Sequence, residues 1–299
     1  MAEVVRGLFV GLATLDLVQR VRRRPGVDEK VVAQCSDLAA GGPAAAAAVT
    51  FRALGGHAML LSALGPGPIG RFVKDDLNSA GVQIADAWAG GADLSVSAIT
   101  VLDGTGERSV VSRNAEDIVV AVPADLPILM KNTDIVLIDG HHPQLAVATA
   151  RAAKDAGVPV VLDCGSTKAV YDELVPLADA VVCSSTFSGL PGEFDTVATA
   201  LVAAGARLVA MTAGAAPVRW RTRDAAGAVE VPAVDVRDTL GAGDVMHGAY
   251  AFARAQGVTD PLRSLNFGVA VASLRVQHAG PRSWLKDPRL HGLVVHPQT

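Results

Sequence analysis

The chain has 299 residues, of which half are hydrophobic and 19% are charged, and its formal net charge is −4. This composition provides enough apolar side chains for a large core, and it argues against a nucleic-acid-binding protein. No apolar run approaches the ~20 residues that span a bilayer, and none near the N-terminus has the length of a signal peptide. Three cysteines without metal-ligand spacing predict reduced thiols, and therefore a cytoplasmic protein.

Short apolar strands alternate with helical segments along most of the chain. Strands are expected at 4–12, 58–63, 135–139, 158–163, 180–183 and 207–212. A late hairpin is expected at 217–231, and an extended segment at 229–236. Helices are expected at 44–54, 69–80, 144–156, 168–177, 195–204, 245–255 and 261–277. Residues 88–113 depart from this alternation, because Ser and Thr interleave with apolar residues, which predicts a hairpin with one face in water. Alternating strands and helices predict an α/β fold whose parallel sheet is covered on both faces.

Polar residues and glycines follow many of the predicted strands or begin the helices after them. These residues are Asp16, Gly41, Gly42, Asp139, Gly140, His141, Asp163, Ser184, Thr212 and Asp238. Ligands of open α/β sheets bind beyond the carboxyl ends of the strands. The pattern therefore predicts one site at one edge of the sheet.

The run Asp238–Asp244 joins an extended segment to a helix through a glycine-rich turn. N–H groups at the start of a helix lack intrahelical partners and lie at the positive end of the helix dipole, so they favour anions. Gly241, Ala242 and Gly243 let a phosphate approach this backbone closely. A carboxylate at Asp244 suits a base that takes a proton from a hydroxyl attacking the phosphate. The alternative is an ordinary turn in which aspartate caps the helix.

The complete run, Asp-Thr-Leu-Gly-Ala-Gly-Asp, resembles the signature Asp-Thr-x-Gly-Ala-Gly-Asp of the ribokinase/PfkB carbohydrate kinase family. The resemblance covers nearly the whole chain. It implies a ribokinase-like three-layer α/β/α sandwich with a mostly parallel central sheet, a single domain over 1–299, and a small β-sheet lid with strands inserted at about 13–40 and 88–116. It also implies that Asp244 is the catalytic base and that Gly241, Ala242 and Gly243 form the anion hole.

The same resemblance implies the binding residues and the cofactors, which are ATP, Mg²⁺ and potassium. Sugar contacts are expected from Thr14, Asp16, Gly41, Gly42 and His141, and from Arg113 if the substrate carries a sulfonate or phosphate; nucleotide contacts are expected from Ser184, Thr212, Gly214 and Val269. A monovalent cation is expected at Asp238, the Leu240 carbonyl and the backbone near Arg275, His278 and Gly280. The lid implies a homodimer.

Two departures from the family pattern bear on the substrate and on the metal. Ala46 replaces an asparagine that bonds the sugar in many relatives, which argues against ribose. Phe187 replaces a glutamate linked to the water around magnesium and phosphate, so Mg²⁺ would depend mostly on ATP and water. His247, close to Asp244, is interpreted as a packing residue.

The resulting hypothesis is an ATP-dependent phosphotransferase acting on a hydroxyl of a small sugar. The sugar would be of the ketohexose or sugar-acid type, with 6-deoxy-6-sulfofructose as one candidate. A nucleoside kinase is the first alternative, although 12 aromatic residues in 299 offer few stacking partners for a base. The second alternative is a catalytically inactive sugar-binding protein of the same fold.

Overall fold

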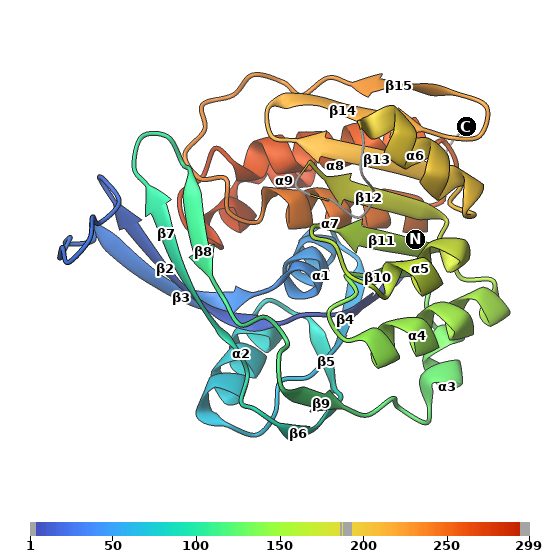
Figure 1. Cartoon of the computed structure of the whole chain (residues 1–299), viewed down its shortest axis with the longest axis horizontal. Helices are drawn as coiled ribbons and strands as arrows, with labels where there is room; N and C mark the ends of the chain where they lie inside the picture. Colours follow the sequence, from blue (N-terminus) through green and yellow to red (C-terminus); the bar gives the residue numbers. More distant parts are fainter. Residues whose placement is uncertain (1–3, 186, 188–192, 294–299) are drawn as a thin grey trace.

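A β-sheet of nine strands forms the centre of the computed structural model, which describes residues 4–185, 187 and 193–293. Its strands are β1 (Arg6–Val10), β4 (His57–Ser62), β5 (Gln83–Asp86), β10 (Ile135–Ile138), β11 (Val160–Cys164), β12 (Ala180–Ser184), β13 (Leu208–Ala213), β14 (Ala216–Arg221) and β15 (Ala226–Val229). The spatial order is β15-β14-β13-β12-β11-β10-β1-β4-β5 (Figure 1). All neighbours from β13 to β5 are parallel, whereas β14 and β15 are antiparallel.

Side chains that alternate along each strand build a separate apolar core on each face of the sheet. Phe9 and Leu137 face one core, while Leu8 and Val136 face the other. The first core is covered by α1 (Pro43–Ala53), α2 (Pro68–Ser79), α7 (Ala242–Ala255), α8 (Pro261–Arg275), η2 (Ser283–Lys286) and α9 (Pro288–Gly292), and the second by α3 (Leu126–Met130), α4 (Pro143–Ala156), α5 (Tyr171–Leu174), η1 (Val175–Leu177) and α6 (Phe194–Ala203). The expected three-layer α/β architecture with a mostly parallel central sheet is confirmed.

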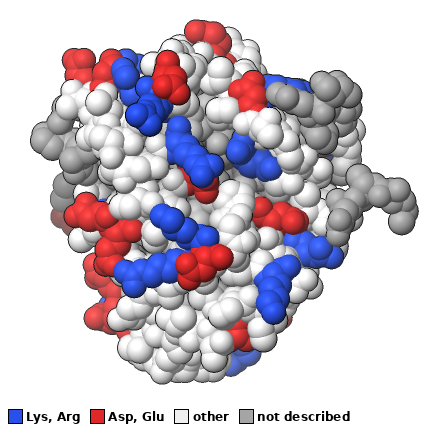
Figure 2. All heavy atoms as spheres, turned by 90° about the vertical axis from the view of Figure 1, so that its right-hand side faces the viewer, with Lys and Arg blue, Asp and Glu red and all other residues white. Residues whose placement is uncertain are grey.

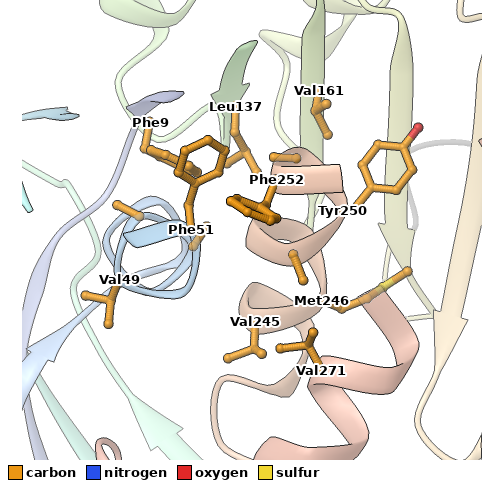
Figure 3. Packing of buried hydrophobic residues seen from close by; sticks show 14 of the residues in the cluster. Phe9, Val49, Phe51, Leu137, Val161, Val245, Met246, Tyr250, Phe252 and Val271 are labelled. Carbon is orange, nitrogen blue, oxygen red and sulfur yellow. The ribbon is translucent and has the colours of Figure 1, made fainter. Parts of the chain in front are cut away.

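Close packing between α1 and α7 sets the relative position of the two helices that begin at the site. Phe51 of α1 contacts Phe9 of β1 and Phe252 of α7 edge-on, with ring centroids 5.3 and 5.4 Å apart (Figure 3). Gly248 of α7 lies so near α1 that a Cβ there would overlap the Ala47 carbonyl oxygen. The small residues of both helices therefore allow their backbones to approach each other, and their N-termini share one edge of the sheet.

A second, smaller sheet stands apart from the central one, at the left of Figure 1. It contains β2 (Thr14–Val21), β3 (Cys35–Gly41), β7 (Val96–Leu102) and β8 (Arg108–Val111), in the order β3-β2-β7-β8. β2 and β7 are parallel, and the two outer pairs are antiparallel. We call this sheet the lid. β6 (Trp88–Gly91) does not join it and pairs instead with β9 (Ile118–Val120).

Several local expectations differ from the structure. Asp16 does not follow the first strand but lies inside β2, because the chain passes from β1 into the lid after only a short bend. The segment at 229–236 is extended only as far as Val229, where β15 ends, and its remainder forms no regular element. β5, α3 and α9 were not expected, since each is too short to produce a periodic pattern.

Charged residues of both signs are interspersed on the face that carries α4 and α5 (Figure 2). An exposed ion pair between Arg151 and Glu173, 3.2 Å apart, links these two helices. Within the described part of the chain, no helix combines the length and apolarity needed to cross a membrane.

Asp139, directly after β10, joins three chain segments at the edge where the site lies. Its buried carboxylate accepts N–H groups from Leu12 at 2.8 Å, Ala44 at 3.2 Å and His141 at 2.9 Å. The bond to Ala44 satisfies an N–H group of the first turn of α1. Gly11 lies so near Asp139 that a Cβ at Gly11 would overlap the Asp139 carboxylate.

We expect Asp139→Ala to lower the free energy of unfolding by about 3 kcal/mol, because it leaves three N–H donors in a buried region without their acceptor. Urea unfolding of the purified protein measures this loss. Asp134→Ala is the matched control: that exposed carboxylate accepts one N–H, from Arg6, so its loss should cost only about 0.5 kcal/mol. Equal effects of the two substitutions would contradict the role given to Asp139.

Candidate active site

A cavity of about 460 Å³, a volume that includes space open to solvent, lies between the lid and the N-termini of α1 and α7. Seven predicted site residues line it: Asp16, Gly41, Gly42, Leu240, Gly241, Asp244 and Arg275. Arg275 was expected only through its backbone, and Arg282 and Trp284, which also line the cavity, were not expected there. The structure therefore brings Asp244 and three of the predicted sugar contacts into one cavity.

Asp16 projects from β2 against the paired glycines at the end of β3. The Thr14 hydroxyl donates to Asp16 Oδ1 at 2.7 Å, and burial raises the pKa of the Asp16 carboxyl. A Cβ at Gly41 would overlap the Asp16 carboxylate. Gly42 adopts φ +93°, and a Cβ there would overlap the Leu12 carbonyl oxygen. Both positions therefore require glycine for steric reasons even without a ligand.

The N-terminus of α7 presents N–H groups to the same cavity. Gly241 precedes the helix in the left-handed conformation, with φ +71°, and its carbonyl accepts the first intrahelical bond, from the Val245 N–H at 2.9 Å. The Ala242 N–H donates to the Thr239 carbonyl at 3.3 Å, whereas the N–H groups of Gly243 and Asp244 have no acceptor within the helix. Space around the Gly243 Cα is open, so a phosphate could approach these amides.

Asp244 belongs to a compact group of charged side chains with Asp163 and His247. One potential ligand atom from each residue lies within 4.8 Å of the other two. His247 Nδ1 is 3.1 Å from Asp163 Oδ2, and both side chains are almost fully buried. Burial, together with the negative charge of Asp163, raises the pKa of Asp244 to about 7, while His247 acts in the opposite direction. Burial disfavours protonated His247, yet the two neighbouring carboxylates prevail and raise the pKa of its ring.

The tip of the β7–β8 hairpin contacts the loop that precedes α7. The Gly106 carbonyl accepts the Thr239 N–H at 3.1 Å and the Thr239 hydroxyl at 2.8 Å. Arg108 Nη1 lies 3.3 Å from the same hydroxyl oxygen, and the positive charge of Arg108 opposes the rise in the pKa of Asp244. The lid is therefore bonded directly to the loop that precedes α7.

Residues 7–288 match the pfkB family of carbohydrate kinases. The chain belongs to this family. It is therefore an ATP-dependent kinase of the type that acts on sugars or nucleosides, and its kinase relatives use ATP, typically with Mg²⁺.

Curated relatives of this pfkB-family chain include two kinases that it matches over most of its length. It is 27% identical to a ribokinase of Arabidopsis thaliana, with 91% of this chain and 76% of the relative covered. It is also 27% identical to an ATP-dependent ribose-1-phosphate kinase of Halopiger xanaduensis, with 94% and 95% covered. Among solved structures, a putative ribokinase from Agrobacterium tumefaciens superposes with a TM-score of 0.83 at 28% identity, covering 95% of this chain and 94% of that one.

The nucleotide-binding residues expected in this pfkB-family kinase divide into two groups. Ser184 and Thr212 are register partners at the carboxyl ends of β12 and β13, and the Thr212 hydroxyl donates to the Cys183 carbonyl at 3.4 Å. Gly214 follows in the turn to β14, with φ +62°. Val269 lies apart from them on α8, and its side chain is buried in the apolar core.

Three expected sugar contacts, Thr14, Arg113 and His141, do not line the cavity. Thr14 is buried and reaches it only through its bond to Asp16. Arg113 forms an exposed ion pair with Asp117 at 2.7 Å, after the end of β8. His141 is partly buried beside Asp139, and burial lowers the pKa of its ring. Arg282 is a positively charged residue of the cavity lining that sequence reasoning missed; its Nη2 donates to the Ala40 carbonyl at 2.8 Å and pairs with Asp76 at 3.1 Å. Its place after α8 gave no periodic or motif signal.

Several of the oxygens expected to bind a monovalent cation are instead bonded to N–H groups of the protein. The Asp238 carboxylate accepts from Leu240, Gly280 and Arg20, and the His278 carbonyl accepts from the Arg275 guanidinium. These oxygens are therefore not free to replace the hydration shell of potassium.

Turnover should fall as the pH drops through about 7, because the base form of Asp244 is the ionised one and its pKa is raised to about 7. The pH dependence of kcat at saturating substrates measures the midpoint. His247→Asn removes a positive charge that favours ionised Asp244, so the midpoint should move to higher pH. A midpoint near the ordinary aspartate value of ~4, or one that His247→Asn does not move, would contradict this electrostatic role.

Proposed function

We propose that this kinase transfers the γ-phosphoryl group of ATP to a hydroxyl of a small sugar. The observation that carries the proposal is the placement of Asp16 and Asp244 in one cavity at the N-terminus of α7. Asp16 can accept hydrogen bonds from sugar hydroxyls, and the Gly41–Gly42 backbone allows a ring to approach. One hydroxyl would then lie between Asp244 and the phosphate held by the helix start.

In the proposed reaction, Asp244 accepts the proton of the attacking hydroxyl. The sugar oxygen forms a bond to the γ-phosphorus while the bond to the bridging β–γ oxygen breaks, and ADP leaves with that electron pair. The N–H groups of Gly243 and Asp244 stabilise the charge on the transferred oxygens, an effect typically worth ~3 kcal/mol per donor. The ends of β12 and β13, with Ser184 and Thr212, hold the nucleotide on the opposite side of the transferred group.

Mg²⁺ bound with ATP neutralises phosphate charge. Phe187 stands where the family has a glutamate, and its ring packs against Tyr171 with centroids 6.0 Å apart, so it supplies no oxygen. Asp163 is already paired with His247. We therefore propose that phosphate oxygens and water provide most of the ligands of Mg²⁺.

Arg282 favours a substrate with an anionic substituent, such as a sugar acid or a sulfonated or phosphorylated sugar. Its guanidinium borders the cavity. Nη2 pairs with Asp76 Oδ2 at 3.1 Å, whereas Nε has no hydrogen-bond partner among the described residues. Arg113 held this role in the sequence hypothesis, but it does not line the cavity and pairs with Asp117. Trp284 also borders the cavity, but its side chain is only 2% exposed and packs in the apolar core, so it offers little surface for stacking on a base. A nucleoside is therefore the less favoured candidate.

We expect Asp244→Asn to bind ATP normally but to lose about 10²- to 10⁴-fold in turnover, because the hydroxyl proton loses its acceptor. ADP release is measured with Mg·ATP across fructose, tagatose, ribose, ribose 1-phosphate, 2-keto-3-deoxygluconate, 6-deoxy-6-sulfofructose, fructose 6-phosphate and adenosine. Asp155→Asn, an exposed carboxylate on α4, is the matched control and should leave turnover unchanged.

A preference for adenosine in this panel would favour the nucleoside alternative. Arg282→Gln should raise KM for an anionic sugar more than for a neutral one, because it removes the positive charge from the cavity wall. Full turnover by Asp244→Asn would rule out the proposed base.

We also propose a homodimer that forms through the lid. A row of apolar residues crosses the lid on the face opposite Asp16: Leu38, Leu17, Ala98 and Val111 are register neighbours in adjacent strands. Leu38 and Val111 are 52% and 75% exposed. Such a continuous exposed row is typical of an interaction surface, and a second copy of the chain offers a self-complementary partner.

Sedimentation equilibrium should give a mass of twice 30.6 kDa for the wild type and of a single chain for Val111→Lys, because the introduced charge would be buried in the interface. Val119→Lys, which alters an exposed valine of β9 outside the lid, should remain dimeric. A monomeric wild type would contradict the proposed dimer.

A further inference from the structure

The carboxylate of Asp238, at the start of the anion-hole loop, is fully buried. Oδ1 accepts the Leu240 N–H at 2.9 Å. Oδ2 accepts the Gly280 N–H at 3.0 Å and Arg20 Nη2, also at 3.0 Å. Both carboxylate oxygens therefore already have donors, and one of these donors carries a full positive charge.

A second guanidinium, that of Arg275, lies beside the same carboxylate. Nη1 donates to the His278 carbonyl at 2.8 Å and lies 3.5 Å from the Asp238 carbonyl oxygen. Nη2 is 3.7 Å from Asp238 Oδ2, and the side chain is only 2% exposed. The group thus borders a carboxylate and two backbone carbonyls, which are the kinds of oxygen that a monovalent cation would use.

The position of Arg275 in the fold explains why a cation is needed there. Arg275 is the last residue of α8, where the helix dipole and the unpaired carbonyls concentrate negative charge. The buried Asp238 adds a full negative charge to the same region. A side chain that begins at the helix end supplies the compensating positive charge from within the chain.

The charge balance disfavours an additional ion. One carboxylate, Asp238, faces two guanidinium groups, those of Arg20 and Arg275. Burial lowers the pKa of Arg275, but arginine remains protonated in proteins. A potassium ion about 4 Å from either guanidinium would be repelled by roughly 4 kcal/mol at an effective dielectric constant of 20.

We propose that the guanidinium of Arg275 takes the place of a monovalent cation in this kinase, so that turnover requires no potassium. Arg275 is a positioning residue: it holds Asp238 and the His278 carbonyl, Asp238 holds the Leu240 N–H, and Gly241 then begins the anion hole. The part of this inference that concerns turnover rests on the proposed kinase activity.

The first experiment compares the wild type in potassium chloride and in tetramethylammonium chloride at equal ionic strength. We expect the same initial rate of ADP release and the same melting temperature in both salts. The melting temperature is measured without ATP or sugar, so it remains informative if no tested sugar is phosphorylated. A saturable rise of about tenfold in rate with potassium, or a rise in melting temperature specific to potassium, would overturn the proposal.

The second experiment removes the internal cation with Arg275→Ala. We expect this variant to lose about tenfold or more in kcat in tetramethylammonium chloride, with a smaller change in KM. Potassium, or guanidinium at low concentration, should restore part of kcat and raise the melting temperature, because either ion can bind beside the uncovered Asp238. Lithium, which is smaller and more strongly hydrated, should do so less. A loss that no cation restores would mean that Arg275 acts only through packing, and would also overturn the proposal.

Two further variants separate this role from general effects. Arg275→Lys keeps a positive charge at the helix end and should remain insensitive to potassium; it also tests the proposal if Arg275→Ala does not fold. Arg151→Ala removes an exposed arginine on α4 that pairs with Glu173, and its salt response should equal that of the wild type. Potassium activation of Arg275→Lys would contradict the assignment.

Discussion

The buried Asp238 carboxylate is the contact on which the arrangement of the active site depends. It bonds Arg20 of β2, the Leu240 N–H of the loop before α7 and the Gly280 N–H beyond α8. A buried charge without partners would cost several kcal/mol, so these segments are held together by the need to satisfy it. The lid, the loop before α7 and the end of α8 are therefore one electrostatic unit, although they are far apart in sequence.

A second group of charges, that of Asp163 and His247, changes the pKa of Asp244. Asp244 and Asp163 lie close together in a largely buried region, so their like charges repel each other. His247 offsets part of this repulsion through its pairing with Asp163. The balance leaves Asp244 less acidic than an ordinary aspartate. Such a carboxylate is a stronger base, yet it is still ionised in a useful fraction near neutral pH.

Much of the fold could be predicted because its causes are local. Alternating apolar strands and helices indicate a parallel sheet, and the glycines at 41, 42 and 241 mark backbone that side chains could not occupy. His247 was interpreted as a packing residue because a buried histidine and an ion-paired one look alike until β11 brings Asp163 beside it.

Long-range contacts explain the other differences. Asp16 was placed at the end of the first strand because nothing in the sequence shows where β1 gives way to the lid. The direction of the Arg275 side chain depends on Asp238, 37 residues away, and no periodic pattern records such a contact.

The hydrogen bonds between the Gly106 carbonyl and Thr239 bear on whether ATP is hydrolysed when no sugar is bound. A lid that moved away to admit sugar would give up these bonds and the Arg20–Asp238 pair, and the loop before α7 would lose its supports. ATP bound before the sugar would then meet an unfinished anion hole. Water makes too few contacts to hold the lid closed, so it would be a poor phosphoryl acceptor. The contacts that complete the site would thereby suppress hydrolysis of ATP in the absence of sugar.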